Sequence, residues 1–151
     1  LSKHPIAYNA FFHSFNDDSG FTEEEVKMIN ETRKILDLPQ LNITATCVRL
    51  PIIGGHGESL NVELNSGYEL NELKQTIAQF PGIVLMDGEE AVGNYPTIKT
   101  CEGRDEVFVG RVRRDLSVEN GVHIWLTADN VRKGAASNAV QIMQKLIANE
   151  K

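Results

Sequence analysis

Residues 44–64 read TATCVRLPIIGGHGESLNVEL, which predicts a strand, a glycine turn and a second strand. Arg49 stands at the end of the first β-branched run, and His56 directly follows the pair Gly54 and Gly55. An arginine at a strand end can bind a carboxylate or a phosphate through two parallel hydrogen bonds. A histidine can transfer protons near neutral pH. The two side chains can therefore hold an anion and act on it, although such residues near turns are more often solvated or structural.

The length and charge of the chain limit the classes of function. With 151 residues the chain can bury one sizeable core, and we expect a single domain over residues 1–151. Its 21 acidic and 15 basic side chains give a formal net charge of −6, which argues against a nucleic-acid or membrane partner and favours small molecules or proteins. Because no apolar run approaches the roughly 20 residues that span a bilayer, and no signal pattern is present, we expect a cytoplasmic protein.

The two cysteines, Cys47 and Cys101, lie far apart and in no spacing typical of metal ligands, so we expect neither a disulfide framework nor a metal site. Cys47 lies in the predicted strand beside Arg49 and can be read as a nucleophile, but a buried thiol is the better interpretation. Numbering opens at Leu1 rather than at a methionine, which we interpret as a processed product or a piece of a longer protein.

A capping box, Thr22 with Glu25, predicts a helix over residues 23–36. Glu24 and Lys27 are neighbours on one face of its first turns. Their ordinary interpretation is an exposed ion pair. The alternative is an anion site, which the positive end of the helix dipole favours.

Alternating and helical apolar patterns predict the remaining elements. Strands are expected over residues 4–12, 43–50, 60–64, 83–86, 106–114 and 122–128, and further helices over residues 70–80 and from Asp129 or Asn130 to about Ala148. Together they predict an α+β fold: a mixed, largely antiparallel sheet with its helices on one face.

Two polar groups on these strands have no assigned role. Arg111, Arg113 and Arg114 suit a phosphate patch, but a solvated edge or a subunit contact is the preferred interpretation. The strand face with His123 and Trp125 is unusually aromatic and is a candidate subunit contact, with His123 itself structural.

Several segments resemble the C-terminal part of aspartate-semialdehyde dehydrogenases, in one unbroken order from about Pro5 to Ile142. They are TCVRLP (46–51) followed by Gly55 and His56, EEVK (24–27), NETRKIL (30–36), VFVGRVRRD (107–115), SVENG (117–121), DNVRKGAA (129–136) and NAVQI (138–142). One local departure is Gly57, where many members of that family have serine. The resemblance implies a C-terminal catalytic and dimerisation domain with a plan like that of glyceraldehyde-3-phosphate dehydrogenase.

The resemblance also implies roles for four residues. The family interconverts L-aspartate 4-semialdehyde plus phosphate with 4-aspartyl phosphate, using NADP, in the route to lysine, threonine and methionine. In that scheme Arg49 binds the substrate α-carboxylate, Glu24 contacts the α-ammonium and Lys27 holds phosphate. His56 is the acid/base.

Asn130 and Gly134 match the family segment that borders the nicotinamide end of the cofactor pocket. The family's nucleophilic cysteine and its N-terminal dinucleotide-binding domain have no match in this chain, so the resemblance implies that NADP binds mainly elsewhere and that this chain alone is inactive. A homodimer or homotetramer is expected. The alternatives are a non-catalytic dimerisation module and a related acyl-phosphate or acyl-CoA reductase, and the choice between NADP and NAD stays open.

Overall fold

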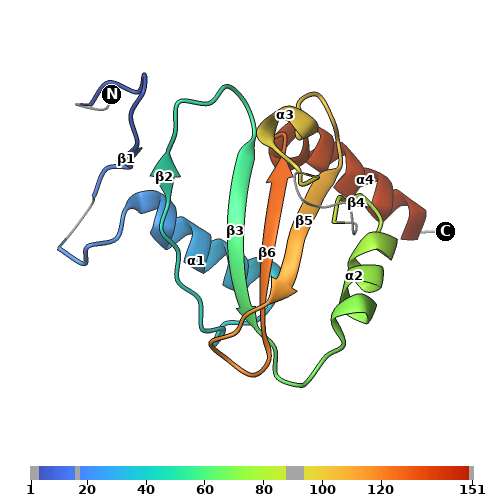
Figure 1. Ribbon diagram of the computed structural model, residues 1–151. Helices are drawn as coiled ribbons and strands as arrows, with labels where there is room; N and C mark the ends of the chain where they lie inside the picture. Colours follow the sequence, from blue (N-terminus) through green and yellow to red (C-terminus); the bar gives the residue numbers. More distant parts are fainter. Residues whose placement is uncertain (1–3, 16–17, 88–93, 150–151) are drawn as a thin grey trace. The chain divides into compact units, whose positions relative to one another are not determined.

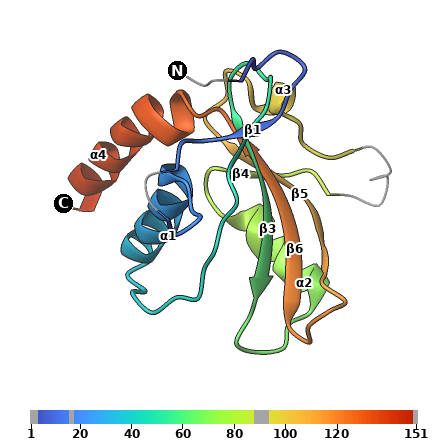
Figure 2. The same ribbon diagram turned by 90° about the vertical axis from the view of Figure 1, so that its left-hand side faces the viewer.

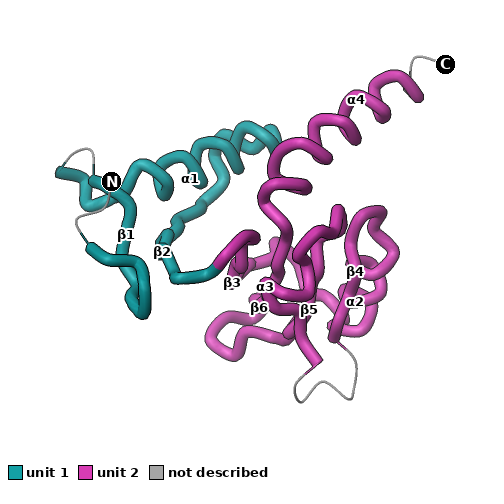
Figure 3. Tube along the Cα trace, turned by 90° about the horizontal axis from the view of Figure 1, so that it is seen from above, with its two compact units in different colours: residues 1–52 teal, residues 53–151 magenta. Residues whose placement is uncertain are grey.

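The structure, a computed structural model, describes residues 4–15, 18–87 and 94–149. Its internal contacts separate into two compact units, Leu1–Ile52 and Ile53–Lys151 (Figure 3). Units of this kind can belong to one domain or to two, so the single domain predicted over residues 1–151 stays a prediction.

Helix α1 (Glu23–Ile35) dominates the first unit and begins as its sequence predicts. The Thr22 backbone N–H donates to Glu25 Oε2 at 2.8 Å, and the Glu25 N–H donates back to the Thr22 hydroxyl at 3.4 Å. Thr22 is fully buried and Glu25 nearly so. The capping box is therefore confirmed as the structure that starts this helix.

The strands of the first unit are much shorter than predicted. β1 (Phe11–Phe12) pairs antiparallel with β2 (Val48–Arg49), with Phe11 opposite Arg49. The longer strands expected over residues 4–12 and 43–50 are wrong. One reason is that the Cys47 N–H donates to Glu25 Oε1 at 2.8 Å, a side chain of α1, instead of to a neighbouring strand.

The second unit is built on a four-stranded sheet in the order β3 (His56–Glu63), β6 (Gly121–Ala128), β5 (Val107–Arg114) and β4 (Ile83–Leu85) (Figure 1). β3–β6 and β6–β5 pair antiparallel, whereas β4 is parallel to β5. The predicted α+β fold with a mixed, largely antiparallel sheet is confirmed.

One face of this sheet forms the core with helix α2 (Leu70–Gln79), which packs along β4 and β5 (Figures 1 and 2). Residues of one parity on each strand point into this core. The buried centre of this core consists of Val109, Val112 and Val122. The partly buried side chains packed against it are Val62, Tyr68, Leu70, Leu73, Ile77, Ile83, Leu85, Val107, Ile124 and Leu126.

The opposite face carries Trp125 and Thr127 and meets the short helix α3 (Ile98–Cys101), which contacts β6 and β5. Cys101 of this helix is fully buried. The Trp125 indole N–H donates to the Pro96 carbonyl at 2.7 Å. A helix on this face adds to the predicted arrangement, in which all helices share the other face.

The chain ends in helix α4 (Ser137–Asn149), preceded by a π-helical turn, Arg132–Ala136. Asp129 caps this segment, because its Oδ1 accepts from the N–H groups of Val131 at 3.0 Å and Arg132 at 3.3 Å. Five apolar side chains of α4 are about half exposed: Val140, Ile142, Met143, Leu146 and Ile147. Among the described residues no helix is long and apolar enough to cross a bilayer.

Candidate functional site

His56 opens strand β3, where it is exposed and pairs with Ala128 of β6. The two glycines before it have φ values of +71° and +72°, a region that other residues seldom adopt. At Gly55 a Cβ would lie 3.0 Å from Ile98 Cγ2 and 3.2 Å from the Ala128 carbonyl oxygen. The turn that presents His56 therefore requires glycine at position 55 for both conformation and space.

Two polar residues at the end of β6 bind this region of the second unit. Asn130 Oδ1 accepts from the Gly55 N–H at 3.1 Å, and Asp129 Oδ2 accepts from the Gly103 N–H at 2.9 Å. The bond from the Gly103 backbone is the main reason that the pKa of Asp129 is lowered. The His56 turn and the loop after α3 are thus both attached to the segment that follows β6.

Gly57, the local departure from the resembling family, has a physical cause. A Cβ at position 57 would lie 2.5 Å from Trp125 Cη2 and 3.4 Å from Ile98 Cδ1. The indole ring occupies the space in which a serine side chain would begin. Position 57 therefore cannot take serine here unless Trp125 moves.

Arg49 and the predicted pair Glu24 and Lys27 belong to the first unit. Arg49 is exposed at the end of β2 and, among the described residues, forms no ion pair. Lys27 Nζ lies 3.2 Å from Glu24 Oε1, and the two side chains are 55% and 37% exposed. The hydrogen bond that the Lys27 ammonium donates to Glu24 is the largest cause of a raised pKa at Lys27. This geometry is that of an exposed ion pair, whose members bind each other and stay accessible to a ligand.

Asn130 and Gly134 are close to each other in the second unit. A Cβ on Gly134 would lie 3.9 Å from Asn130 Cβ, and Gly134 itself is exposed in the π-helical turn. The backbone thus brings together the two residues predicted to border a cofactor.

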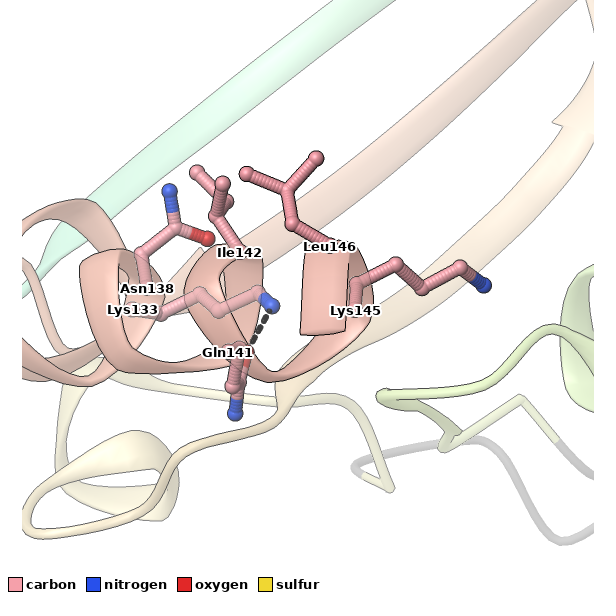
Figure 4. Close-up of a pocket in the computed structure, with 6 residues that line it drawn as sticks. All are labelled: Lys133, Asn138, Gln141, Ile142, Lys145 and Leu146. Atoms are coloured by element: carbon pink, nitrogen blue, oxygen red, sulfur yellow. Dashed lines mark hydrogen bonds between the residues drawn. The ribbon is translucent and has the colours of Figure 1, made fainter. Parts of the chain in front are cut away.

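A shallow cavity of about 280 Å³ lies beside this segment, on one side of α4 (Figure 4). Its lining residues are Lys133, Asn138, Gln141, Ile142, Lys145 and Leu146. Lys133 Nζ donates to Gln141 Oε1 at 2.7 Å, the bond drawn in the close-up. None of the predicted site residues lines this cavity.

The polar cluster at the far end of β5 and β6 is organised around Asp115. Its carboxylate accepts from Asn61 Nδ2 and from both the N–H and the hydroxyl of Ser117, at 2.8 and 2.7 Å, and His123 Nε2 lies 3.6 Å away. The Asn61 bond, followed by those of Ser117, lowers the pKa of Asp115 to about 2. A second open cavity of about 500 Å³ is lined by Asp115, Ser117 and His123 of this cluster, together with Arg113, Arg114 and Leu116.

The three arginines of β5 make contacts within the chain, and their role as a phosphate patch or a subunit contact stays a prediction. Arg114 donates to the Tyr68 carbonyl at 2.8 Å and stacks 4.6 Å from the Tyr68 ring centre. Arg113 donates to the Arg111 carbonyl at 3.0 Å, across the bulge where Arg111 has a φ of +52°. Two of the guanidinium groups are thus bound to the chain itself.

The predicted site residues divide between the units: Glu24, Lys27 and Arg49 in the first, and His56, Asn130 and Gly134 in the second. Within each unit the structure places them on identifiable elements and at accessible positions. Their convergence on one pocket stays a prediction. Among the described ranges, no group of three or more His, Cys, Asp or Glu side chains is arranged to hold a metal ion.

Comparison with known proteins identifies the family. The sequence-family model of the semialdehyde dehydrogenase dimerisation domain matches residues 1–133. The chain belongs to the semialdehyde dehydrogenase family. Within that family it is 44% identical to the aspartate-semialdehyde dehydrogenase of Aquifex aeolicus over 146 residues, which is 95% of this chain and 42% of that protein. The Bacillus subtilis enzyme is 44% identical over 144 residues, 93% of this chain and 41% of that protein.

Solved structures of this family share the fold. The crystal structure of aspartate-semialdehyde dehydrogenase II from Vibrio cholerae has a TM-score of 0.89 and 40% identity, and covers 97% of this chain and 43% of that one. A second structure of that enzyme is complexed with ASA. The enzyme from Candida albicans with NADP, at 22% identity and a TM-score of 0.72, supports the fold alone. The predicted fold and the predicted resemblance to this dehydrogenase family are confirmed.

The chain spans about two fifths of the length of these relatives. The family match ends at Lys133, inside the π-helical turn that precedes α4. The exposed apolar residues of α4 thus lie outside the residues that the family model matches.

Proposed function

We propose that this chain is the substrate-binding and dimerisation part of an NADP-dependent aspartate-semialdehyde dehydrogenase. The proposed reaction converts L-aspartate 4-semialdehyde, phosphate and NADP⁺ into 4-aspartyl phosphate, NADPH and a proton. The observation that carries the proposal is the 44% identity to two such enzymes over nearly the whole chain. A role in lysine, threonine and methionine synthesis in the cytoplasm follows from the same proposal.

The charges of the proposed site residues match this substrate. Aspartate semialdehyde carries one carboxylate and one ammonium group, and the second substrate is a phosphate anion. Arg49 would bind the carboxylate, Glu24 the ammonium and Lys27 the phosphate, each by a charge-assisted hydrogen bond. The exposed Glu24–Lys27 pair supports this assignment, because both side chains are accessible and a bound ligand can replace the contact between them.

His56 would move a proton at the reacting carbon. Its exposed position at the start of β3, after two glycines with positive φ, supports a role in chemistry rather than in packing. A general acid/base must reach the substrate within hydrogen-bond distance, which an exposed imidazole on a fixed backbone can do.

The residues present also suit a nicotinamide cofactor. When bound, NADP supplies the hydride acceptor. Asn130 offers an amide donor and Gly134 offers an exposed backbone without a side chain, groups that can approach a carboxamide and a flat ring. The nucleophilic cysteine and most of the cofactor site would come from the remainder of the polypeptide, since the chain spans about 42% of its relative.

The proposed partner is a second copy of the chain, as a homodimer or homotetramer. The match to a dimerisation domain over residues 1–133 supports such assembly. The second candidate function, a non-catalytic dimerisation module, rests on the same match.

The deciding experiment measures NADPH formation by the full-length protein that contains this chain, with aspartate semialdehyde and phosphate as substrates. We expect turnover that requires phosphate, and none from the 151-residue chain alone. Succinate semialdehyde, which lacks the α-ammonium, is the matched control substrate and should react far more slowly. Absence of turnover from a folded, dimeric full-length protein would overturn the proposed reaction and leave the non-catalytic module and a related acyl-phosphate or acyl-CoA reductase as the alternatives.

A further inference from the structure

We propose that Asn130 is a positioning residue for His56, acting through the backbone of Gly55. The inference rests on the proposed function only for the acid/base role of His56. The contact itself is a property of the second unit: Asn130 Oδ1 accepts from the Gly55 N–H at 3.1 Å, and Gly55 is the residue before His56.

The backbone before His56 needs such a contact. Gly54 and Gly55 both have positive φ, and glycine has more conformational freedom than any other residue. The His56 side chain is exposed and forms no hydrogen bond or ion pair with another described residue. The point from which the imidazole projects is therefore set by the backbone at positions 55 and 56.

The Asn130 side chain continues the sheet by one hydrogen bond at this point. The β3–β6 ladder ends with His56 opposite Ala128, so Gly55 lies beyond the last pair of the register. Asn130 is two residues past the end of β6, and its amide oxygen accepts from the Gly55 N–H, which lies beyond the last pair of the ladder. The other walls of the turn are Ile98 Cγ2, the Ala128 carbonyl and Cys101 Sγ, at 3.0, 3.2 and 3.4 Å from a Cβ position on Gly55.

Asn130 has a second polar group available for the cofactor. Its oxygen is used by Gly55, whereas its Nδ2 donates to no other described residue. Gly134 is adjacent, at 3.9 Å between the two Cβ positions. One amide would thus set the His56 turn with its oxygen and bind the nicotinamide end with its nitrogen. A movement of the Asn130 side chain would therefore change both the His56 turn and the contact with the cofactor.

The contact is tested first without activity, by amide hydrogen exchange at Gly55 in the full-length protein that contains this chain. Asn130→Ala should raise the exchange rate of the Gly55 N–H at least about tenfold, because its acceptor is lost. Asn130→Asp keeps an oxygen at the same reach and should stay near the wild-type rate. Asn138→Ala, an asparagine eight residues further on, is the matched control. An unchanged Gly55 rate in Asn130→Ala overturns the inference.

The catalytic consequence is tested in the full-length protein at saturating NADP. Asn130→Ala should lower kcat at least about tenfold with the KM for aspartate semialdehyde changed less than about twofold, because a misplaced acid/base affects the transition state more than the ground state. Asn130→Asp should recover most of kcat while raising the KM for NADP, since it keeps the oxygen and loses the nitrogen donor. Asn138→Ala should match wild type.

The results separate the two proposals. If the wild-type full-length protein has no turnover, the proposed function fails and the Gly55 exchange result still decides the contact. If the wild type is active and Asn130→Ala keeps its kcat, the positioning role fails and the proposed function stands. If Asn130→Ala does not fold, Asn130→Ser, whose shorter side chain does not reach Gly55, replaces it in both measurements. Equal loss of kcat in Asn130→Asp and Asn130→Ala also overturns positioning through Gly55.

Discussion

The Trp125 ring fills the space beside Gly57 on the adjacent strand: a Cβ at position 57 would lie 2.5 Å from Trp125 Cη2. Real Cβ atoms do not come this close to a ring carbon, so the residue pair is complementary in size. The indole is also fixed by its hydrogen bond to the Pro96 carbonyl at 2.7 Å. This pair explains why glycine follows His56 in this chain where the resemblance leads us to expect serine.

We expect Gly57→Ser to destabilise the 151-residue chain. Inserting atoms into a filled space costs about 1–3 kcal/mol of unfolding free energy, because neighbouring side chains must leave their rotamers. Urea unfolding measures this loss. The emission of Trp125, the single tryptophan of the sequence, should shift as its ring moves. Gly134→Ala is the control, because the nearest atom to its added Cβ is 3.9 Å away, and its stability should equal or exceed wild type. A Gly57→Ser variant as stable as wild type, with unchanged emission, would contradict this account.

Asp115 should contribute to the acid sensitivity of the fold. Its pKa falls from 3.8 to about 2 in the folded chain, mainly through the bond from Asn61 and then through those from Ser117. A pKa lowered on folding stabilises the folded state above the unfolded pKa, and this contribution is lost as the pH falls towards 2. We therefore expect Asn61→Ala to weaken the decline in unfolding free energy between about pH 4 and pH 2, because it removes the largest cause of the shift. Urea unfolding across this range, at fixed ionic strength, measures the slope. Parallel curves for wild type and Asn61→Ala would exclude Asp115 as a source of acid sensitivity.

The sequence predicted those elements whose signals are local. The capping box at Thr22 and Glu25 starts α1 as expected, because both partners lie within one turn. The strands of the second unit follow from their alternating side chains. The strand expected over residues 43–50 failed because Glu25 uses its second carboxylate oxygen for the Cys47 N–H, 22 residues away. A pattern of apolar residues cannot predict a side-chain hydrogen bond between such distant positions.

The candidate site was less predictable from the sequence than these elements. The roles of Arg49, Glu24, Lys27 and His56 came from the resemblance and not from spacing, and they stay predictions. The contact between Asn130 and Gly55 was missed, because it depends on the pairing of β3 with β6 across 75 positions of sequence. The available signal was an asparagine directly after a strand and a glycine pair directly before one, but only the register connects the two.

Arg49→Lys in the full-length protein should lower kcat/KM for aspartate semialdehyde at least about tenfold, roughly 1.4 kcal/mol of transition-state binding. Lysine keeps the charge but loses the planar fork that binds a carboxylate with two hydrogen bonds. Steady-state kinetics with varied semialdehyde measures the effect. Arg104→Lys is the matched control, because Arg104 pairs with Glu106 in the second unit and has no proposed role. Unchanged kinetics in Arg49→Lys would remove Arg49 from the site.

His56→Asn should lower kcat in the full-length protein by about 10²–10⁴-fold, the usual contribution of a positioned acid/base. Asparagine keeps a polar side chain of similar reach but cannot take up a proton, so the KM for the semialdehyde should change little. His123→Asn is the matched control, since His123 lies 3.6 Å from Asp115 in the cluster at the far end of β6. A variant of His56 that binds substrate weakly but turns it over at the normal rate would assign this side chain to binding, and the proton would then have to move through another group.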